Sequence, residues 1–265
     1  MQLKYGTPYL TTYDLVKSLA VLLMLLDHVG YFFYPENDWF RVAGRGALPI
    51  WAFLIGYATT RELSKSLLGW AGVLLVVNVV TGGPFLPLNV LFTFIGIRMI
   101  IDRTARFVFG GWEVMIYSVI AMCVFFVPTT YASEYGTGAL MIALCGLMMR
   151  HSGQLPVSKR AQNGFFIFVA IFHALSQNIL FSFGILESKA SAFLIGGVMV
   201  MMYFFKPLEL IKATEKTPRP ITGMLQFAGR YTLEIYAIHM IIFKLIAAQY
   251  HLEGYGFFDF KLLPP

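Results

Sequence analysis

The stretch YDLVKSLAVLLMLLDHVGYFF, residues 13–33, decides the architecture of the chain because it is apolar over the thickness of a bilayer. About 20 predominantly apolar residues cross the hydrocarbon region as a helix with a rise of about 1.5 Å per residue. The same stretch contains Asp14, Lys17, Asp27 and His28. A charged residue near the centre of such a helix costs about 2.5–3.5 kcal/mol on insertion scales. We therefore expect this helix to support chemistry or transport, which a plain membrane anchor does not need.

The spacing of these groups places most of them on one face of the helix. Lys17 and His28 are separated by about three helical turns, which is about 16 Å along the axis. Asp14 falls on the same face, whereas Asp27 points about a quarter turn away from His28. The pattern predicts a polar stripe that runs from one membrane surface towards the other. The alternative is that Asp14 and Lys17 merely lie at the helix start, in the headgroup region.

Composition places the whole chain in the membrane. Of its 265 residues 58% are hydrophobic and only 13% are charged, with a mean hydropathy of +0.69. A soluble domain contains about 25% charged residues, and no charge-rich segment here is long enough for a separate soluble domain. We attribute the formal net charge of +6 to the positive-inside bias and to anionic headgroups, and expect no nucleic-acid partner. Residues 1–265 are therefore expected to form a single transmembrane domain.

Apolar stretches of helical length predict an all-α, polytopic integral membrane protein with about nine transmembrane helices. Their ranges are 13–33, 46–60, 66–81, 90–101, 112–127, 136–149, 164–181, 190–205 and 226–249. With the N-terminus inside, the inner loops contain Lys4, Arg61, Lys65, Arg98, Arg103, Arg106, Arg150, Lys159, Arg160, Lys206, Lys212, Lys216 and Arg219. The outer loops then contain only Arg41, Arg45, Lys189 and Lys261. This asymmetry favours an N-terminus inside and a C-terminus outside.

His28 is the best candidate for chemistry, because a histidine can accept and return a proton near neutral pH. Asp27 or another carboxylate is suited to orient it, and the alternative is a buried histidine bonded to a backbone carbonyl. Arg45 lies near the level of His28 in the nine-helix model. Its fixed charge is suited to pair with Asp27 or to stabilise a developing oxyanion. An interfacial arginine that contacts headgroups is the alternative reading of Arg45.

Other polar residues fall within or next to the predicted spans. His239 lies in the middle of the last one, either as a second site residue or as an interhelical hydrogen-bond donor. Arg230 and Glu234 are spaced to pair with each other on one helix face. Asn89 opens the fourth span on the outer side. No metal-ligand spacing, GxSxG elbow or Walker-type loop occurs, which argues against a metalloprotease, a serine hydrolase and an ATP-driven pump.

Five blocks of the chain together resemble the TraX family, which is named for the F-pilin acetylase. The blocks are DLVKSLAVLLMLLDHVG, DWFRVAGRGALPIWAFLIGY, LNVLFTFIGI, EYGTGALMIALCGL and LEIYAIHMIIFKLIAA. Lys17, ten residues and then His28 also resemble the basic-residue-x10-His pattern of the acyltransferase-3 membrane enzymes. The resemblance implies an acetyltransferase of the bacterial inner membrane that acetylates a pilin N-terminus. It also implies that His28 is catalytic and that Lys17, Arg45 and His239 are functional.

The resemblance and the polar stripe combine into one expected mechanism. Acetyl-CoA is the donor, with its phosphates at a basic inner mouth and its pantetheine arm along the stripe to His28. Arg98, Arg103 or Arg106 assist Lys17 at the mouth. His28 then deprotonates the acceptor, and Arg45 or Asn89 stabilises the oxyanion. The catalytic residues are thus expected to be His28, Asp27 and Arg45, and the donor-binding residues Lys17, Asp14, Asn89, Arg98 and His239.

Two other functions are compatible with the same residues. Intramembrane Asp, Lys and His also mark ion paths, so a proton-coupled transporter is the main rival. The sequence shows no inverted repeat of the kind that many transporters contain. A non-catalytic membrane scaffold is the other rival. Among acetyltransferases, the acceptor is expected to be a pilin amine, with a glycan or another small acceptor as the alternative.

Overall fold

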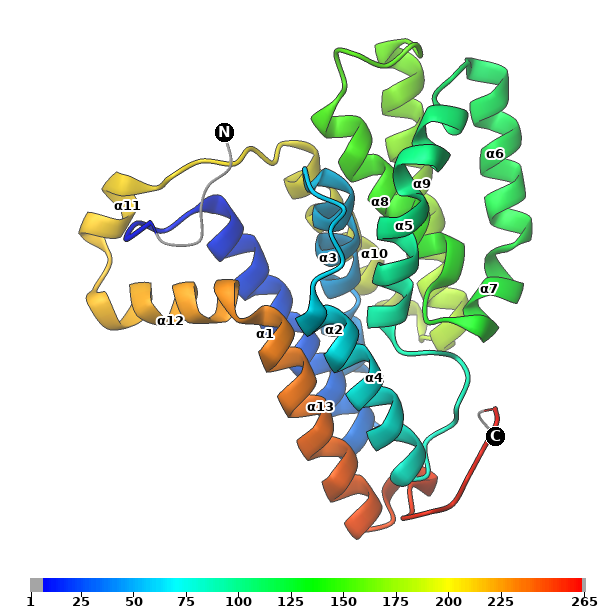
Figure 1. Ribbon diagram of the computed structural model, residues 1–265, viewed down its shortest axis with the longest axis vertical. Coiled ribbons are helices and arrows are strands. Elements are labelled where there is room, and N and C mark those ends of the chain that lie inside the picture. Colours follow the sequence, from blue (N-terminus) through cyan, green and yellow to red (C-terminus); the bar gives the residue numbers. More distant parts are fainter. Residues whose placement is uncertain (1–6, 264–265) are drawn as a thin grey trace.

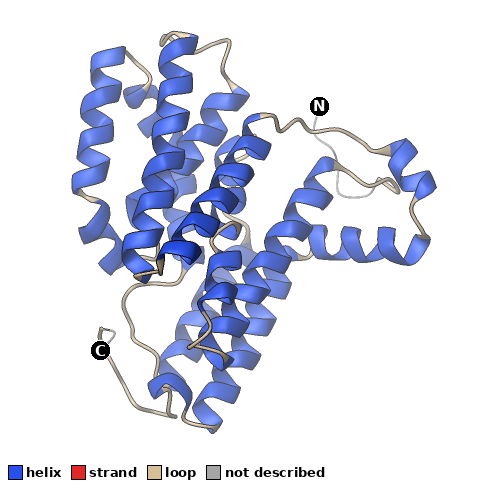
Figure 2. Cartoon of the chain, turned by 180° about the vertical axis from the view of Figure 1, so that it is seen from behind, coloured by secondary structure: helices blue, strands red, loops and turns tan. Residues whose placement is uncertain are grey.

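The computed structural model describes residues 7–263 and consists of helices joined by short connections (Figure 2). Within that range the only β structure is three isolated bridges, so the predicted all-α class is confirmed. Lys4, which the sequence assigns to the inner side, lies outside the described residues. The helices are α1 (Thr12–Phe33), α2 (Asp38–Gly44), α3 (Ala47–Tyr57), α4 (Lys65–Val80), α5 (Val90–Val108), α6 (Trp112–Val124), α7 (Phe126–Ala132), α8 (Gly136–Arg150), α9 (Lys159–Phe181), α10 (Ile185–Tyr203), α11 (Ile211–Lys216), α12 (Arg219–Arg230), α13 (Thr232–Gln249) and the 3₁₀ turn η1 (Leu252–Gly254).

The first helix is defined at its start by a capping box. The Thr11 hydroxyl accepts a hydrogen bond from the backbone N–H of Asp14 at 3.1 Å. In return, the Asp14 carboxylate accepts one from the N–H of Thr11 at 2.9 Å. Such a reciprocal pair satisfies backbone donors that a helix start otherwise leaves open. From there α1 runs beside α13, with α2, α3 and α12 packed around it (Figure 1).

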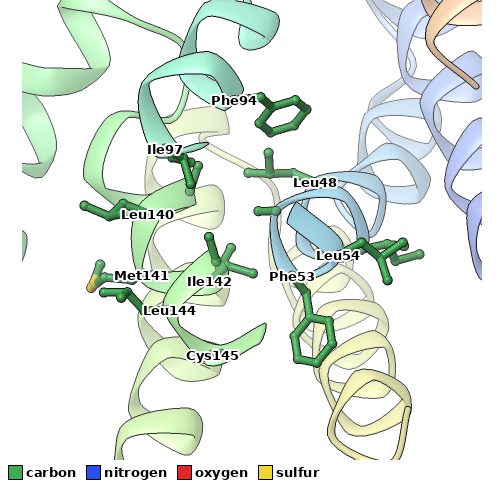
Figure 3. Close-up of a cluster of buried hydrophobic side chains, with 14 of the residues drawn as sticks. Leu48, Phe53, Leu54, Phe94, Ile97, Leu140, Met141, Ile142, Leu144 and Cys145 are labelled. Carbon is green, nitrogen blue, oxygen red and sulfur yellow. The ribbon is translucent and has the colours of Figure 1, made fainter. Parts of the chain in front are cut away.

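The hydrophobic core is centred where α3 crosses α8. Gly56 of α3 lies against the backbone of Ala143, and Gly146 of α8 lies against the backbone of Phe53. A Cβ atom at either glycine would collide with the facing backbone, so the absence of a side chain lets the two helices approach closely. Leu48 and Phe53 of α3 face Ile142 and its neighbours on α8 in this cluster (Figure 3).

The prediction of nine transmembrane helices is wrong. Among the described residues, four helices are long and apolar enough to cross a membrane, namely α1, α9, α10 and α13. The pair α6 and α7 passes the same test only when it is taken together, and it is bent by 53°. Length and composition therefore support four or five spans, and the membrane character of the chain rests on these.

The sequence predicted too many membrane spans because a helix buried in the protein core is as apolar as a helix that faces lipid. Helix α3 has 11 residues, α8 has 15 and α4 has 16, all shorter than the roughly 20 residues that a span needs. Nearly all of α8 is buried by its neighbours, so its apolar side chains serve the protein core. Helix α5 is longer but carries Arg98, Asp102, Arg103 and Arg106.

The predicted span 226–249 is also wrong at its start, since the helix breaks at Tyr231. Before the break, α12 lies crosswise to α13 and rests on the first half of α1 (Figure 1). The Ser18 hydroxyl of α1 donates to the carbonyl of Leu225 at 2.8 Å. Ile221, Met224 and Phe227 stay exposed on the other face. A short amphipathic helix with an exposed apolar face is typical of a helix that lies in the membrane interface.

The two ends of the helix bundle differ in charge. The end that contains the start of α1 also contains the α3–α4, α8–α9 and α10–α12 connections (Figure 1). Contacts such as Thr12 N–H to Leu208 O at 3.0 Å and Arg98 to Glu62 O at 2.9 Å hold these segments together. We call it the basic end, because it contains Arg61, Lys65, Arg150, Lys159, Arg160, Lys206, Lys212, Lys216 and Arg219.

Candidate functional site

A cavity of about 910 Å³ extends from the basic end into the bundle. Residues of α1, α3, α5 and α13 supply most of its wall. Lys17 and His28, which are about 16 Å apart along α1, both line it. The predicted polar stripe therefore faces one continuous space. The charged and histidine residues on its wall are Asp14, Lys17, Asp27, His28, Glu62, Arg98, Glu134, Arg150 and Arg230.

His28 and His239 form a hydrogen-bonded pair beside the cavity. Nδ1 of His28 lies 2.7 Å from Nε2 of His239, and Nδ1 of His239 lies 2.7 Å from the carbonyl oxygen of Ile235. A carbonyl oxygen can only accept, so Nδ1 of His239 carries a hydrogen. In the neutral pair, Nε2 of His239 must then accept from Nδ1–H of His28. This leaves Nε2 of His28 as an acceptor, and His28 is the member of the pair that lines the cavity.

Asp27 pairs with two arginines, Arg41 of α2 and Arg45, the residue that follows α2. Its carboxylate pairs with Arg45 and, at 3.2 Å, with Arg41. Gly44 allows this approach, because a Cβ atom there would collide with the Asp27 side chain. The hydrogen-bond partner that orients His28 is thus His239, while Asp27 forms part of the cavity wall as the acid of an ion-paired cluster.

Arg45 lies behind Asp27 and away from the cavity surface. Besides Asp27, it donates to the Gln177 side chain at 3.1 Å and to the carbonyl of Arg41 at 3.0 Å. Its guanidinium also stacks 4.0 Å from the centre of the Phe181 ring. Of the two roles expected from the sequence, the structure shows the pairing with Asp27. The pairing of Arg41 with Asp27 was not predicted from the sequence. The available signal was that Arg41 lies four residues before Arg45, which places both arginines on one helix face.

The mouth of the cavity is lined by cations from four different helices. Lys17, Arg98 and Arg230 come from α1, α5 and α12, and Arg150 comes from the end of α8. Arg150 donates to the carbonyl of Tyr57 at 2.5 Å. Arg103 and Arg106, the other donor-binding candidates on α5, are exposed and do not line the cavity.

Asp14 is held by Arg230 at the same mouth. The Arg230 guanidinium lies 3.3 Å from the Asp14 carboxylate and donates to the carbonyl of Thr7 at 3.0 Å. The expected pair of Arg230 with Glu234 is replaced by this longer-range pair, because the break at Tyr231 separates them between two helices. Asp14 thus joins the start of α1 to the end of α12.

Asn89 does not line the large cavity. It caps α5, where its side chain accepts from Leu91 N–H at 3.2 Å and donates to Ala71 O at 3.2 Å. It lines a smaller neighbouring cavity of about 40 Å³ together with Asn78, Glu134, Tyr236 and Lys244. The structure therefore brings Lys17, Asp14, Asp27, His28 and Arg98 to the wall of the large cavity, places His239 behind His28 as its hydrogen-bond partner, and leaves Arg45 and Asn89 away from the cavity.

Sequence reasoning missed Glu134, Tyr135 and Tyr236, which line the same cavity as His28. The ring of Tyr236 lies 6.0 Å from that of His28, so we assign the three residues to the deep end. Glu134 and Tyr135 form the connection between α7 and α8, and Tyr135 has a left-handed φ of 65°. Burial raises the pKa of Glu134 to about 7. The available signal for Glu134 was a carboxylate between two apolar stretches. From the sequence alone, such a residue is interpreted as the polar start of a membrane span.

The helices, the apolar candidate spans and the charged internal cavity together define an all-helical protein of membrane character with a polar cavity in its interior. The chain belongs to the TraX family, because the family model described as TraX protein matches residues 12–247. The family resemblance drawn from the sequence blocks is thereby confirmed. The relation to the acyltransferase-3 enzymes stays a prediction.

Curated relatives match the chain at low identity. The uncharacterized protein RP591 of Rickettsia prowazekii (strain Madrid E) is 23% identical over 246 residues, which is 91% of this chain and 94% of the relative. Protein TraX of Escherichia coli is 28% identical over 49% of this chain, and that of strain K12 is 29% identical over 52%. These matches span 54% and 56% of the two TraX proteins, a little over half of their length. No solved structure matches the chain.

Proposed function

We propose that this protein is a membrane acetyltransferase that takes its acetyl group from cytoplasmic acetyl-CoA. The acceptor lies at the outer side of the bacterial inner membrane, and the N-terminal amine of a pilin is our leading candidate. The observation that carries the proposal is the single cavity that joins a cationic mouth to the free Nε2 of His28. Its volume of about 910 Å³ is within the range of about 300–1,000 Å³ that is usual for small-molecule sites.

The mouth is suited to the nucleotide end of CoA. Guanidinium groups bind phosphate oxygens through paired hydrogen bonds, and an ammonium binds them as a compact charge. Arg98, Arg150 and Lys17 supply such groups at the rim. The positive-inside rule supports a cytoplasmic location of the basic end, which is the side where acetyl-CoA is made. The pantetheine arm then follows α1 towards His28.

The histidine pair is suited to the acyl-transfer step. Nε2 of His28 takes a proton from the acceptor amine as its nitrogen attacks the thioester carbonyl carbon. The C–N bond forms, the C–S bond breaks, and the proton passes from His28 to the leaving sulfur. His239 holds the imidazole in the required tautomer through Nδ1. The hydroxyl groups of Tyr135 and Tyr236, which line the same end of the cavity, are suited to donate to the oxyanion.

The test is to incubate the purified protein in lipid nanodiscs with acetyl-CoA and a panel of acceptors. The panel includes peptides with a free N-terminal amine, the same peptides blocked at that amine, and oligosaccharides. We expect acetylation of the free amine, detected by mass spectrometry, with a loss of about 10²–10⁴-fold in turnover for His28→Ala.

His151→Ala is the matched control, because His151 lies in the α8–α9 connection and does not line the cavity. That variant should keep the activity of the unmodified protein. Failure to acetylate any acceptor, or an undiminished activity of His28→Ala, would overturn the proposal. The rival transporter predicts ion movement across proteoliposomes without any binding of acetyl-CoA.

A further inference from the structure

The large cavity and its small neighbour share two wall residues, Glu134 and Tyr236. The small cavity of about 40 Å³ has room for one to a few water molecules, since about 10–15 Å³ of this kind of space is enough for one. Lys244 lines the small cavity and does not line the large one. Glu134 thus stands between the reaction space and a second polar compartment.

The backbone around Glu134 is fixed on both sides. Its N–H donates to the carbonyl of Leu88 at 3.0 Å, and its own carbonyl accepts from the Thr93 hydroxyl at 2.7 Å. One carboxylate oxygen accepts from Val90 N–H, at the start of α5, at 3.0 Å. The carboxylate is therefore held in place at the deep end of the large cavity.

Glu134 differs from Asp27, the other acidic residue at the deep end. Asp27 is neutralised by Arg45 and Arg41, whereas no ion pair joins Glu134 to a cation in the described part of the chain. Lys244 lines the small cavity together with Glu134, but its ammonium group donates to the Asn78 side chain. The deep end consequently presents one carboxylate whose charge is not neutralised by direct contact.

We propose that Glu134 is the acceptor subsite for a protonated primary amine and the first group to remove a proton from it. This inference rests on the acetyltransferase function proposed above. The ammonium group R–NH₃⁺ binds the Glu134 carboxylate and transfers one proton to it, which leaves R–NH₂ next to His28. Glu134 then returns to the ionised form by releasing the proton to water in the small cavity.

The remaining steps balance the reaction. The lone pair of R–NH₂ attacks the thioester carbon, the C–N bond forms, and the C–S bond breaks. His28 moves the second amine proton to the sulfur of CoA. Overall, R–NH₃⁺ and acetyl-CoA give the acetamide, CoA-SH and one proton, and the carboxylate of Glu134 accounts for that proton.

The groups that face Glu134 support this role. Burial raises its pKa to about 7, while the charges of Lys244 from α13 and Arg41 from α2 lower it and that of Asp27 from α1 raises it. His28, Tyr135 and Tyr236 are the other titratable groups that line this end of the cavity. A carboxylate that titrates near neutral pH can both take a proton from an ammonium group and release it again.

The test compares two acceptors that differ in charge at pH 7. A peptide with a free α-amino group has a pKa of about 7.7–8.0 and is mostly protonated, whereas aniline is neutral. We expect Glu134→Gln to reduce kcat/KM for the peptide by about 10²-fold or more, and to leave transfer to aniline and the affinity for acetyl-CoA unchanged. Glutamine keeps an oxygen that can accept from Val90 N–H, so the variant preserves the observed hydrogen bond.

Lys244→Met provides a second measurement. Removing that positive charge should raise the pKa of Glu134, so the acid limb of the pH profile for the peptide should move to higher pH. Transfer to aniline should show no such movement. An equal loss for both acceptors in Glu134→Gln would show a structural role and overturn the inference. Absence of transfer to either acceptor by the unmodified protein would instead overturn the acetyltransferase, and the subsite with it.

Discussion

The two members of the histidine pair beside the cavity are expected to have different tasks. His28 lines the cavity, whereas His239 lies between His28 and the carbonyl of Ile235. We therefore expect His239 to be a positioning residue that acts through His28. Glutamine at position 239 still offers an oxygen to Nδ1–H of His28, but leucine offers none.

His239→Gln should accordingly keep most of the activity, and His239→Leu should lose more. A buried donor left without a partner costs about 1–3 kcal/mol, which corresponds to about 5- to 150-fold in rate. The loss should appear in kcat, with the KM for acetyl-CoA unchanged. Steady-state kinetics of the two variants check this, and equal losses in both would contradict the hydrogen-bond role.

At the mouth, Lys17 is expected to bind the donor because it lies about 16 Å from His28 along α1, too far to take part in acyl transfer. Lys17→Ala should raise the KM for acetyl-CoA and leave kcat nearly unchanged. Arg103→Ala is the matched control, since Arg103 is exposed on α5 and does not line the cavity. Titration of acetyl-CoA against both variants measures whether each substitution changes the affinity for the donor. An unaltered affinity in Lys17→Ala would refute a donor-binding mouth.

At the scale of the elements, the α3–α8 crossing positions the cavity wall. Gly146 lies against the backbone of Phe53, so Gly146→Ala forces the two helices apart. Overpacking of this kind costs about 1–3 kcal/mol. Gly69→Ala on α4 is the control, because a Cβ atom there meets nothing within 4 Å. Thermal unfolding in detergent should show a lower midpoint for Gly146→Ala alone, and equal midpoints would contradict the role of the crossing.

The elements also show how far the sequence predicts the fold. Periodicity and apolar length located most of the helices, including α4 and α8 to within a residue or two at each end. They did not separate a helix that faces lipid from one that is buried in protein, because both are uniformly apolar. The break between α12 and α13 was missed although Gly229 lies two residues before Tyr231, because glycine is also common inside membrane-spanning helices.

The candidate site could be predicted along one helix but not between helices. Helical spacing placed Lys17 and His28 on one face of α1, and both line the cavity. Arg45 and Asn89 were assigned to the same space from their depth alone, and the structure places them behind its wall. Glu134 and Arg150 reach the cavity only because the α3–α8 crossing brings their segments to it, which no local pattern encodes.

At the scale of the whole molecule, the basic end is expected to face the cytoplasm. Ser158 lies at that end, in the connection before α9. Ser188 lies near the start of α10, at the opposite end of the bundle. After replacement of the free cysteines Cys123 and Cys145, a single cysteine at Ser158 should react only from inside. One at Ser188 should react only from outside. Labelling of both from the same side with an impermeant reagent would contradict this orientation.

The large cavity opens at the basic end of the bundle and stops inside it, beside Asp27, His28 and Glu134. It therefore has the geometry of a channel that is closed at one end. Asp27 of the Asp27, Arg41 and Arg45 cluster lines this cavity, and Arg45 lies behind it, where it bonds to Gln177 and stacks on Phe181. A fixed cation at a constriction repels protons and other cations. We therefore expect the cluster to act as a permeability barrier as well. Arg45→Ala should let a proton gradient across proteoliposomes decay faster, so the damage would fall on the energised state of the host membrane as well as on acetyl transfer.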